Sequence, residues 1–344
     1  MNKKILIIKT GALGDIISSF HFFFTLKENF PDDEIFLLTQ KIYKDAVEFC
    51  PVFKKIFYLP EGFNFLKFLK IIKILRRLKF NMICDIQGNI KTNFYSFLIG
   101  GRKRYGIYKK MIGRLFLTKG LRIKKRRING KVFYEKSRKS IFEILGIKKY
   151  VKELKIYIPE EKREIFKNFI KNNNVNENKK WIIIHPLTTK GYLAKRWLKK
   201  NFAQLADKLI EDGYEVIFVG KGELEYVNDI ILKMRTKPKN LVDKTDFYNL
   251  CLLIEKASLV ITTDSSPLHI SSIFGTKSIG IFGPTNPEKI CPKNAYYIYK
   301  KVDCSPCYKK RCKSMKCMEE IKVENVYDKV KEILKDEDKY IKFN

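Results

Sequence analysis

The chain has 344 residues, enough for two domains with separate hydrophobic cores. Its 45% hydrophobic and 31% charged residues are typical of a globular protein, and no run approaches the roughly 20 apolar residues that a membrane-spanning helix needs. The 70 Lys and Arg against 37 Asp and Glu give a formal charge of +33. A lysine-coated surface would explain the bases but not the shortage of acids. The charge therefore favours an anionic partner: nucleic acid, a phospholipid surface or a phosphorylated substrate.

The N-terminal residues predict the opening of a doubly wound α/β domain. Lys4–Ile8 is a short apolar run expected to form a buried strand, Thr10–Asp15 is a glycine-containing turn, and Ile16–Asn29 has helical spacing. The turn lacks the G-x-G-x-x-G of a dinucleotide site. Lys9 and Asp15 interrupt what would otherwise resemble a signal peptide. We therefore expect a cytoplasmic protein whose eight cysteines form no disulfides.

The rest of the first half continues this alternation and is strongly basic. Strands are expected at Glu34–Leu38, Lys55–Leu59 and Asn81–Ile86, and helices near Tyr43–Phe49 and at Phe65–Leu78. The helix at Phe65–Leu78 mixes Lys and Arg with Leu and Ile, which suits a helix lying on an anionic membrane. We favour the alternative, a core-packed helix with a lysine outer face. Gly101–Lys131, the most basic region, forms either a solvated face or an anion-binding or membrane-facing patch.

The second half repeats the alternation after Glu160–Asn178, where a charged helical segment ends in an Asn-rich stretch, KNNNVNENKK, whose composition is typical of a linker. Strands are expected at Trp181–His185, Tyr214–Val219 and Asn240–Val242, helices at Asn201–Glu211, Phe247–Lys256 and Val323–Leu334, and a charged tail at Lys335–Asn344. We therefore predict α/β domains at residues 1–159 and 160–325, followed by a C-terminal helix and tail at 326–344. Two such domains in tandem imply a cleft between their strand ends.

Groups suited to binding a pyrophosphate follow several strands of the second half. Leu259–Pro287 is expected to form strand, loop, helix and strand, with hydroxyls, Asp264 and His269 at the loop ends. The phosphate-binding candidates at successive strand ends are Thr188 and Thr189 with Lys195, then Gly220–Gly222, then Asp264–Ser266. Ligands of parallel sheets bind at these ends, beside free helix N–H groups, so the pattern favours a nucleotide. Glu223 can accept hydrogen bonds from a ribose diol.

Four segments carry a specific resemblance in their order and spacing: KILIIKTGALGD at the start, DIQGNIKT at Asp85–Thr92, HPLTTKGYLAKRW at His185–Trp197 and TTDSSPLHISSIFGTKSIGIFGPTNP at Thr262–Pro287. The sequence resembles the ADP-heptose:lipopolysaccharide heptosyltransferases of glycosyltransferase family 9. The resemblance implies the GT-B architecture, two Rossmann-like domains facing across a central cleft. It places the acceptor on the N-terminal domain and the nucleotide-sugar donor on the C-terminal domain.

The resemblance also implies roles for single residues. Asp15 matches the acidic residue that acts as general base of an inverting transfer, and Lys195 matches the lysine that contacts the donor phosphate. Donor contacts are also implied for Thr188, Thr189, Glu223, Asp264, Ser265, Ser266 and His269. Ser266-Pro267 stands where the family has a glycine and its neighbour. From the residues alone, Asp15 also suits a helix N-cap and His269 a satisfied helix histidine.

We expect no cofactor and no metal at the catalytic site. No D-x-D pair of the kind that holds a metal–diphosphate is apparent, so Lys195 and helix dipoles would stabilise the departing ADP. Cys304, Cys307, Cys312 and Cys317 have the spacing C-x2-C-x4-C-x4-C, enough ligands for zinc or an iron–sulfur cluster. We favour buried or paired thiols for these four cysteines.

These observations predict an inverting glycosyltransferase that moves heptose from ADP-heptose to the inner core of lipopolysaccharide. We expect it to be peripherally associated with the anionic cytoplasmic face of the inner membrane, with Arg102, Lys103 and Arg104 contacting the acceptor. The nearer alternative is the same fold with another nucleotide sugar or acceptor, including a protein. The alternative of another class is a basic nucleic-acid-binding protein with a metal at its cysteine cluster; under the leading interpretation no nucleic acid is expected.

Overall fold

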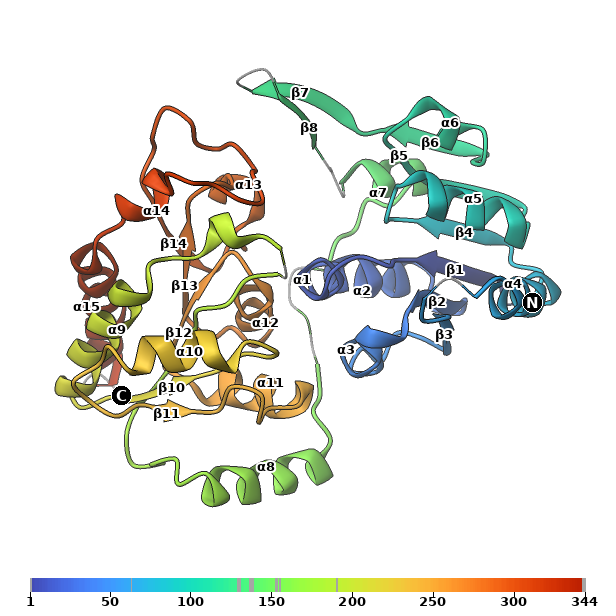
Figure 1. The fold of residues 1–344 in the computed structure, drawn as a ribbon. Helices are drawn as coiled ribbons and strands as arrows, with labels where there is room; N and C mark the ends of the chain where they lie inside the picture. Colours follow the sequence, from blue (N-terminus) through green and yellow to red (C-terminus); the bar gives the residue numbers. More distant parts are fainter. Residues whose placement is uncertain are drawn as a thin grey trace. The chain divides into compact units, whose positions relative to one another are not determined.

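The computed structural model describes residues 2–62, 64–128, 131–135, 139–151, 154, 156–189 and 191–341. The chain divides into two compact units, Met1–Ile156 and Tyr157–Asn344. Each unit contains a six-stranded parallel sheet with helices on both faces (Figure 1). The predicted α/β fold is therefore confirmed within each unit.

The first unit is built on a sheet with the order β3-β2-β1-β4-β5-β6. Its elements are β1 (Lys4–Ile8), α1 (Leu13–Ile17), α2 (Phe20–Asn29), β2 (Glu34–Gln40), η1 (Lys41–Tyr43), α3 (Lys44–Glu48), β3 (Lys55–Leu59), α4 (Phe65–Arg77), β4 (Met82–Asp85), α5 (Ile90–Ile99), β5 (Lys103–Tyr108), α6 (Met111–Arg114), β6 (Lys119–Arg122), an antiparallel hairpin of β7 (Lys124–Ile128) and β8 (Lys131–Glu135), and α7 (Lys139–Leu145). Leu6 and Ile8 of β1 pack with Ile72 and Leu75 of α4. Because helices cover both faces of the sheet, β1 is apolar and buried from Ile5 to Ile8.

The second unit has the same strand order, β11-β10-β9-β12-β13-β14. Its elements are α8 (Glu160–Asn172), β9 (Trp181–His185), η2 (Leu193–Lys195), α9 (Lys199–Glu211), β10 (Glu215–Phe218), α10 (Leu224–Ile231), β11 (Lys239–Asn240), α11 (Phe247–Lys256), β12 (Leu259–Thr263), α12 (Ser266–Phe274), β13 (Ser278–Phe282), α13 (Pro287–Ile290), β14 (Tyr296–Tyr299), α14 (Lys316–Glu319) and α15 (Val323–Ile341). Trp197, Ile184 and Val330 belong to one buried cluster, and Trp197 Nε1 donates to Ile321 O at 2.8 Å. The C-terminal helix is thereby anchored to this unit.

Both sheets reverse their strand order at one point, between β1 and β4 and between β9 and β12. All pairings within the two six-stranded sheets are parallel, so every strand of a sheet ends at the same edge. In open α/β sheets a ligand crevice opens at the carboxyl edge where the order reverses, because the neighbouring connections leave to opposite faces. Each unit therefore carries one such candidate location.

Three segments differ from expectation. The helix expected over Ile16–Asn29 is two helices, because Ser18 Oγ and Ser19 Oγ donate to Asp15 O and compete with the helical pattern. The Asn-rich stretch lies inside the second unit, where Asn176 N donates to Glu215 Oε1. Helix α15 extends to Ile341 through the expected charged tail, which contains no Gly or Pro to stop it.

The turn between β4 and α5 depends on Gly88. Its φ is +68°, and an added Cβ would lie 2.4 Å from Ile107 Cγ1. We predict that Gly88→Ala lowers the free energy of unfolding of the first unit by about 3 kcal/mol, from left-handed strain plus overpacking. Gly62 has the same φ of +68° and open space around it, so Gly62→Ala is the matched control, with a loss of about 1 kcal/mol. Equal losses by chemical denaturation would contradict the role of the Ile107 contact.

Candidate functional site

In the first unit, Asp15 lies at the carboxyl edge of the sheet, in the first turn of α1 directly after β1. The N-cap of α1 is Ala12, so the interpretation of Asp15 as the helix cap is wrong. The Asp15 side chain is exposed. A Cβ on Gly11 would lie 2.8 Å from Gln87 Oε1 and 3.2 Å from Asp15 Oδ2, so these two side chains flank the same small space. The absence of a side chain at Gly11 keeps that space open.

Asp85, at the end of β4, shapes the loop that carries Gln87. Its Oδ1 accepts hydrogen bonds from Gln87 N at 3.0 Å and Gly88 N at 3.1 Å, and Asn93 Nδ2 donates to its Oδ2 at 2.6 Å. The carboxyl is fully buried, and burial raises the pKa of Asp85 to about 6 despite these hydrogen bonds. Gln87 Oε1 is buried without a hydrogen-bond partner among the described residues. Asp85 therefore positions Gln87, whose amide is available to a ligand.

The predicted acceptor residues Arg102, Lys103 and Arg104 lie at the other edge of this sheet. β5 begins at Lys103, so these side chains stand at the amino ends of the strands, a full strand away from Asp15. Arg104 Nε donates to Phe116 O and its Nη1 to Gly101 O, both at 3.0 Å. The structure does not bring these residues to Asp15.

In the second unit, an ion pair joins two predicted donor-binding residues. Lys195 Nζ lies 2.6 Å from Asp264 Oδ2, and Thr285 Oγ1 donates to the same oxygen at 2.9 Å. Asp264 is only 7% exposed, and Lys195 also lies over the ring of Tyr192 at 5.1 Å. A buried carboxylate needs such partners to remain charged. Asp264 therefore holds the lysine ammonium at the carboxyl edge of β12.

A neutral histidine organises the loop before α12. His185 Nδ1 lies 3.1 Å from Ser265 Oγ and 3.3 Å from Thr262 Oγ1, and the two hydroxyls are 2.7 Å apart. Burial lowers the pKa of His185 to about 4, so the ring is uncharged at pH 7. Ser265 is the N-cap of α12 but its hydroxyl makes no capping bond. The hydroxyl of Ser265 is thus committed to His185 and Thr262, and the first turn of α12 receives no side-chain cap from it.

The other predicted donor residues follow the carboxyl ends of β9, β10 and β12, at the same edge of the sheet as this ion pair. Thr188 Oγ1 is buried without a hydrogen-bond partner among the described residues, and the neighbouring Thr189 is exposed. Glu223 forms an ion pair with Arg196, whose guanidinium lies 4.2 Å from the centroid of the Tyr226 ring. The remaining two, Ser266 and His269, lie in the first two turns of α12. Glu223 is therefore shared with Arg196 before any ribose is bound.

Sequence reasoning missed four residues of these sites: Gln87, His185, Arg196 and Thr285. Gln87 directly follows a predicted strand and His185 is the last residue of another, so the sequence indicated that both lie at strand ends. Arg196 is adjacent to Lys195, and its pairing with Glu223 spans 27 residues. No local signal links Thr285 to Asp264, because their contact depends on the parallel pairing of β12 with β13.

The four clustered cysteines are free thiols. Cys317 is buried, which raises its pKa to about 11, while Cys304 is exposed and Cys307 and Cys312 are half-buried. The expectation of buried or paired thiols therefore holds only for Cys317. Within the described part of the chain, no three His, Cys, Asp or Glu side chains are grouped closely enough to hold a metal ion.

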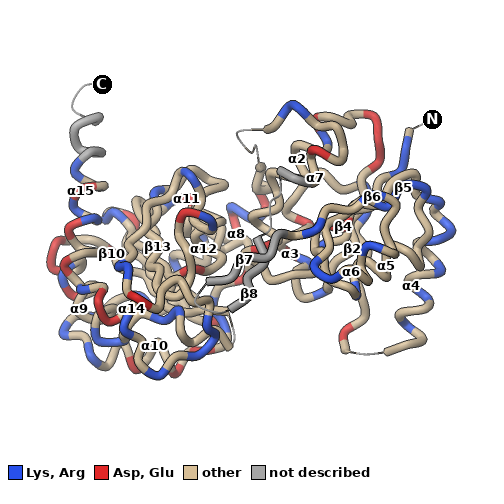
Figure 2. Tube along the Cα trace, turned by 90° about the horizontal axis from the view of Figure 1, so that it is seen from above, with Lys and Arg blue, Asp and Glu red and all other residues tan. Residues whose placement is uncertain are grey.

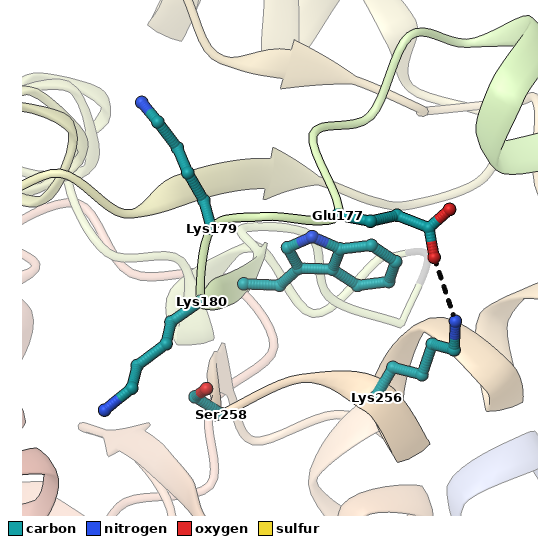
Figure 3. Close-up of a pocket in the computed structure, with 6 residues that line it drawn as sticks. Glu177, Lys179, Lys180, Lys256 and Ser258 are labelled. Atoms are coloured by element: carbon teal, nitrogen blue, oxygen red, sulfur yellow. Dashed lines mark hydrogen bonds and ion pairs between the residues drawn. The ribbon is translucent and has the colours of Figure 1, made fainter. Parts of the chain in front are cut away.

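A small polar pocket of about 150 Å³ lies at the opposite edge of the second sheet (Figure 3). It is lined by Glu177, Lys179, Lys180, Trp181, Lys256 and Ser258. Lys256 Nζ and Glu177 Oε2 are paired at 3.1 Å across it. Trp181 begins β9 and Ser258 precedes β12, so the pocket lies at the amino ends of these strands and is separate from the donor residues.

The family model and the curated relatives point to one family. The model of glycosyltransferase family 9 (heptosyltransferase) matches residues 68–318. Lipooligosaccharide heptosyltransferase 2 of Campylobacter jejuni (serotype O:2) is 36% identical over 201 residues, 56% of this chain and 60% of that relative. The chain thus spans about 60% of the length of this relative. A lipopolysaccharide core heptosyltransferase of Haemophilus influenzae is 24% identical over 300 residues, 85% of this chain and 82% of that relative.

Solved structures share the fold along nearly the whole chain. The glycosyl transferase family 9 protein from Veillonella parvula has a TM-score of 0.81 at 22% identity and covers 97% of both chains. The E. coli ADP-heptose lps heptosyltransferase II has a TM-score of 0.76 at 18% identity and covers 97% of this chain and 99% of that chain. These structures confirm the expected GT-B pair of Rossmann-like domains, and together with the family match they do not favour the nucleic-acid-binding alternative.

The buried Asp85 predicts a pH dependence of stability. Its pKa is about 6 in the folded protein against 3.8 in a free carboxyl, so the folded state binds more protons between these values and stability falls as the pH rises through them. We predict that the free energy of unfolding of Asp85→Asn, relative to that of wild type, rises by about 2 kcal/mol between pH 4 and pH 7. Denaturation at a series of pH values measures this difference. Asp32→Asn, at an exposed site of the same unit, is the control; a pH-independent difference for Asp85→Asn would contradict the raised pKa.

Proposed function

The chain belongs to glycosyltransferase family 9, the heptosyltransferases, and on that basis we propose that it transfers heptose from ADP-heptose to the inner core of lipopolysaccharide with inversion at the anomeric carbon. The observation that carries the proposal is the family match over residues 68–318, combined with polar groups at the carboxyl edge of both sheets. Each half of the reaction then has its own set of residues.

The donor half of the reaction is assigned to the second unit. Lys195, held by Asp264, presents an ammonium to the diphosphate, and the unpartnered hydroxyl of Thr188 is available to a phosphate oxygen. The hydroxyl of Ser265 is fixed by the neutral His185, so this loop is already ordered before the donor binds. Preorganised donors at the leaving group stabilise negative charge as it develops, each by roughly 3 kcal/mol.

The acceptor half is assigned to the first unit, with Asp15 as general base. Its exposed carboxylate takes the proton from an acceptor hydroxyl as the oxygen attacks the anomeric carbon. The bond from that carbon to the phosphate oxygen breaks, ADP departs with the electron pair, and the proton remains on Asp15. Gln87, beside Asp15 at Gly11, offers an amide for a second acceptor hydroxyl.

We further propose that the protein works as a peripheral enzyme at the cytoplasmic face of the inner membrane. Support comes from the formal charge of +33, which suits both an anionic bilayer and a phosphorylated core acceptor. No helix within the described residues has the length and apolar character required to cross a bilayer.

Transfer is tested with purified lipopolysaccharide precursors and a set of nucleotide sugars. We predict turnover with ADP-heptose and a 10²- to 10⁴-fold lower rate for Asp15→Asn, the usual contribution of a general base. The affinity for ADP, measured calorimetrically, should stay within twofold of wild type. Asp45→Asn, another exposed acid of the first unit, is the matched control and should retain full turnover. Absence of turnover with every nucleotide sugar would refute the proposed function, and full activity of Asp15→Asn would remove Asp15 as the base.

The role of the buried ion pair is tested on ADP binding alone. We predict that Lys195→Met weakens ADP binding by about tenfold to 100-fold, since a charge-assisted hydrogen bond contributes roughly 1.5–3 kcal/mol. Asp264→Asn should also weaken it, because the lysine is then no longer held. Lys199→Met removes a lysine of the same unit that pairs with Asp229, and ADP affinity should not change. An unchanged affinity of Lys195→Met would show that the lysine does not contact the donor.

A further inference from the structure

One segment of the first unit has almost no acidic residues. From Gly62 to Tyr134 the chain contains 20 Lys or Arg and a single acid, Asp85, which is fully buried. None of the five cations of α4 forms an ion pair with a described residue. Figure 2 shows the Lys and Arg of α4 in blue along the helix. The surface around α4 is therefore rich in cations that no acid of this segment neutralises, which is unusual even for a chain with 70 bases and 37 acids.

The same surface exposes large apolar side chains. Helix α4 packs on the core through Ile72 and Leu75, as we expected, yet Leu66 on its outer side is 77% exposed. Nine of the 18 exposed large apolar side chains of the described chain lie on or next to three short segments of this unit: Phe65, Leu66, Leu69 and Ile74 on α4, Phe94 and Phe97 on α5, and Met111, Ile112 and Leu115 at α6. A purely solvated lysine face would not carry them.

The helices that carry these apolar side chains lie next to one another. Phe68 of α4 contacts Tyr95 of α5, with ring centroids 4.8 Å apart, and Phe94 of α5 contacts Phe116 after α6 at 5.2 Å. Helices α4, α5 and α6 thus follow one another across one side of the first sheet. Helix α4 begins after the carboxyl end of β3, and α6 begins after the carboxyl end of β5, the edge that also carries Asp15. The face therefore reaches the edge assigned to the acceptor.

The end of α4 adds a cavity suited to phosphate groups. A hollow of about 760 Å³ is lined by Lys73, Arg76, Arg77, Lys79, Phe80, Asn81, Gly100 and Arg102. Five of these eight residues are cations and none is acidic. Arg102, which lies at the other edge of the sheet from Asp15, is one of the residues that line this cavity. The face thus combines apolar side chains near the start of α4 with phosphate-binding groups at its end.

Of the partners considered, only one suits both the exposed apolar side chains and the cations of this surface. Nucleic acid would use the cations but leave the exposed Leu, Met and Phe unburied. A second copy of the chain, docked face to face, would oppose one uncompensated cationic surface to another. An anionic phospholipid bilayer accepts apolar side chains at its acyl boundary and cations at its phosphates.

We propose that the outer face of α4, α5 and α6, with the cavity at the end of α4, is the surface by which this protein binds an anionic phospholipid bilayer. Leu66 and Leu115 enter the acyl boundary, and the cations around Arg76 and Arg102 bind headgroup phosphates. The inference rests on the proposed function, because a lipid-anchored acceptor is what requires an enzyme at the bilayer. Binding to lipid can nevertheless be measured without any transfer.

The test is co-sedimentation of the full chain with vesicles. Wild type should bind vesicles of phosphatidylethanolamine and phosphatidylglycerol, bind pure phosphatidylcholine at least tenfold more weakly, and lose affinity with added salt. The double variant Leu66→Glu/Leu115→Glu should bind the anionic vesicles at least tenfold more weakly than wild type. Ile165→Glu/Leu232→Glu makes the same charge change at exposed apolar sites of the second unit, so this matched control should bind at least threefold more tightly than the test variant.

Each outcome decides the proposal. Equal losses in the test and control variants would show that net charge alone drives binding and would overturn the assigned face. Tighter binding of a DNA duplex than of anionic vesicles would overturn it in favour of nucleic acid. If the double variant unfolds at a lower temperature, Lys70→Gln/Arg77→Gln, which changes only exposed residues, replaces it with the same expectation of weaker binding. The two proposals can fail separately. If wild type binds vesicles but transfers no sugar to a delipidated, water-soluble acceptor, only the proposed function is refuted. If wild type transfers sugar to this acceptor but binds no vesicles, only the docking surface is refuted.

Discussion

The common direction of the parallel strands in each sheet determines where nearly all the candidate functional residues of this protein lie. In each unit the order of the strands reverses once, and the connections on either side of that point leave to opposite faces of the sheet. Asp15 and Gln87 flank the reversal in the first unit, and His185 and Asp264 flank it in the second. The central strands, β1 and β4 in the first unit and β9 and β12 in the second, are almost entirely buried. The candidate functional side chains therefore lie at the carboxyl edge of each sheet, where the loops on either side of the reversal diverge to opposite faces.

Buried polar groups order the side chains at the carboxyl edges of both sheets. Asp85 is fully enclosed and uses its oxygens to hold the loop that presents Gln87. Asp264 plays a comparable part for Lys195, and His185 remains neutral so that it can share a hydrogen bond with the hydroxyl of Ser265. Each of these groups costs desolvation energy that its partners offset only in one geometry. The result is a set of hydrogen-bond donors that are already oriented at the proposed donor site.

The outer surface of the first unit obeys a different constraint. Its helices must bury one stripe against the sheet, and Ile72 and Leu75 of α4 satisfy that requirement. The exposed Leu66, with cations nearby and no acid, has no role in packing. Core packing and membrane binding were alternatives for this helix at the level of the sequence. In the structure the core-packed helix is established, and its outer side still has the composition from which we infer lipid binding.

From the sequence we could derive the α/β class, most of the strands and helices outside the basic region Gly101–Lys131, and the polar strand ends, because hydrophobic periodicity and the residues after each apolar run are local properties. Lys195 and Asp264 could be named because they follow strands that are recognisable in the sequence, whereas the role of Asp15 was implied by the family resemblance. Only the tertiary structure decided that Asp264 is bonded to Lys195 and Thr285, that Asp85 is enclosed, and that Arg102 stands at the far edge of its sheet. Those facts depend on which strands lie side by side and on what covers each side chain. Burial and pairing arise from contacts between residues distant in the chain, and no local pattern encodes them.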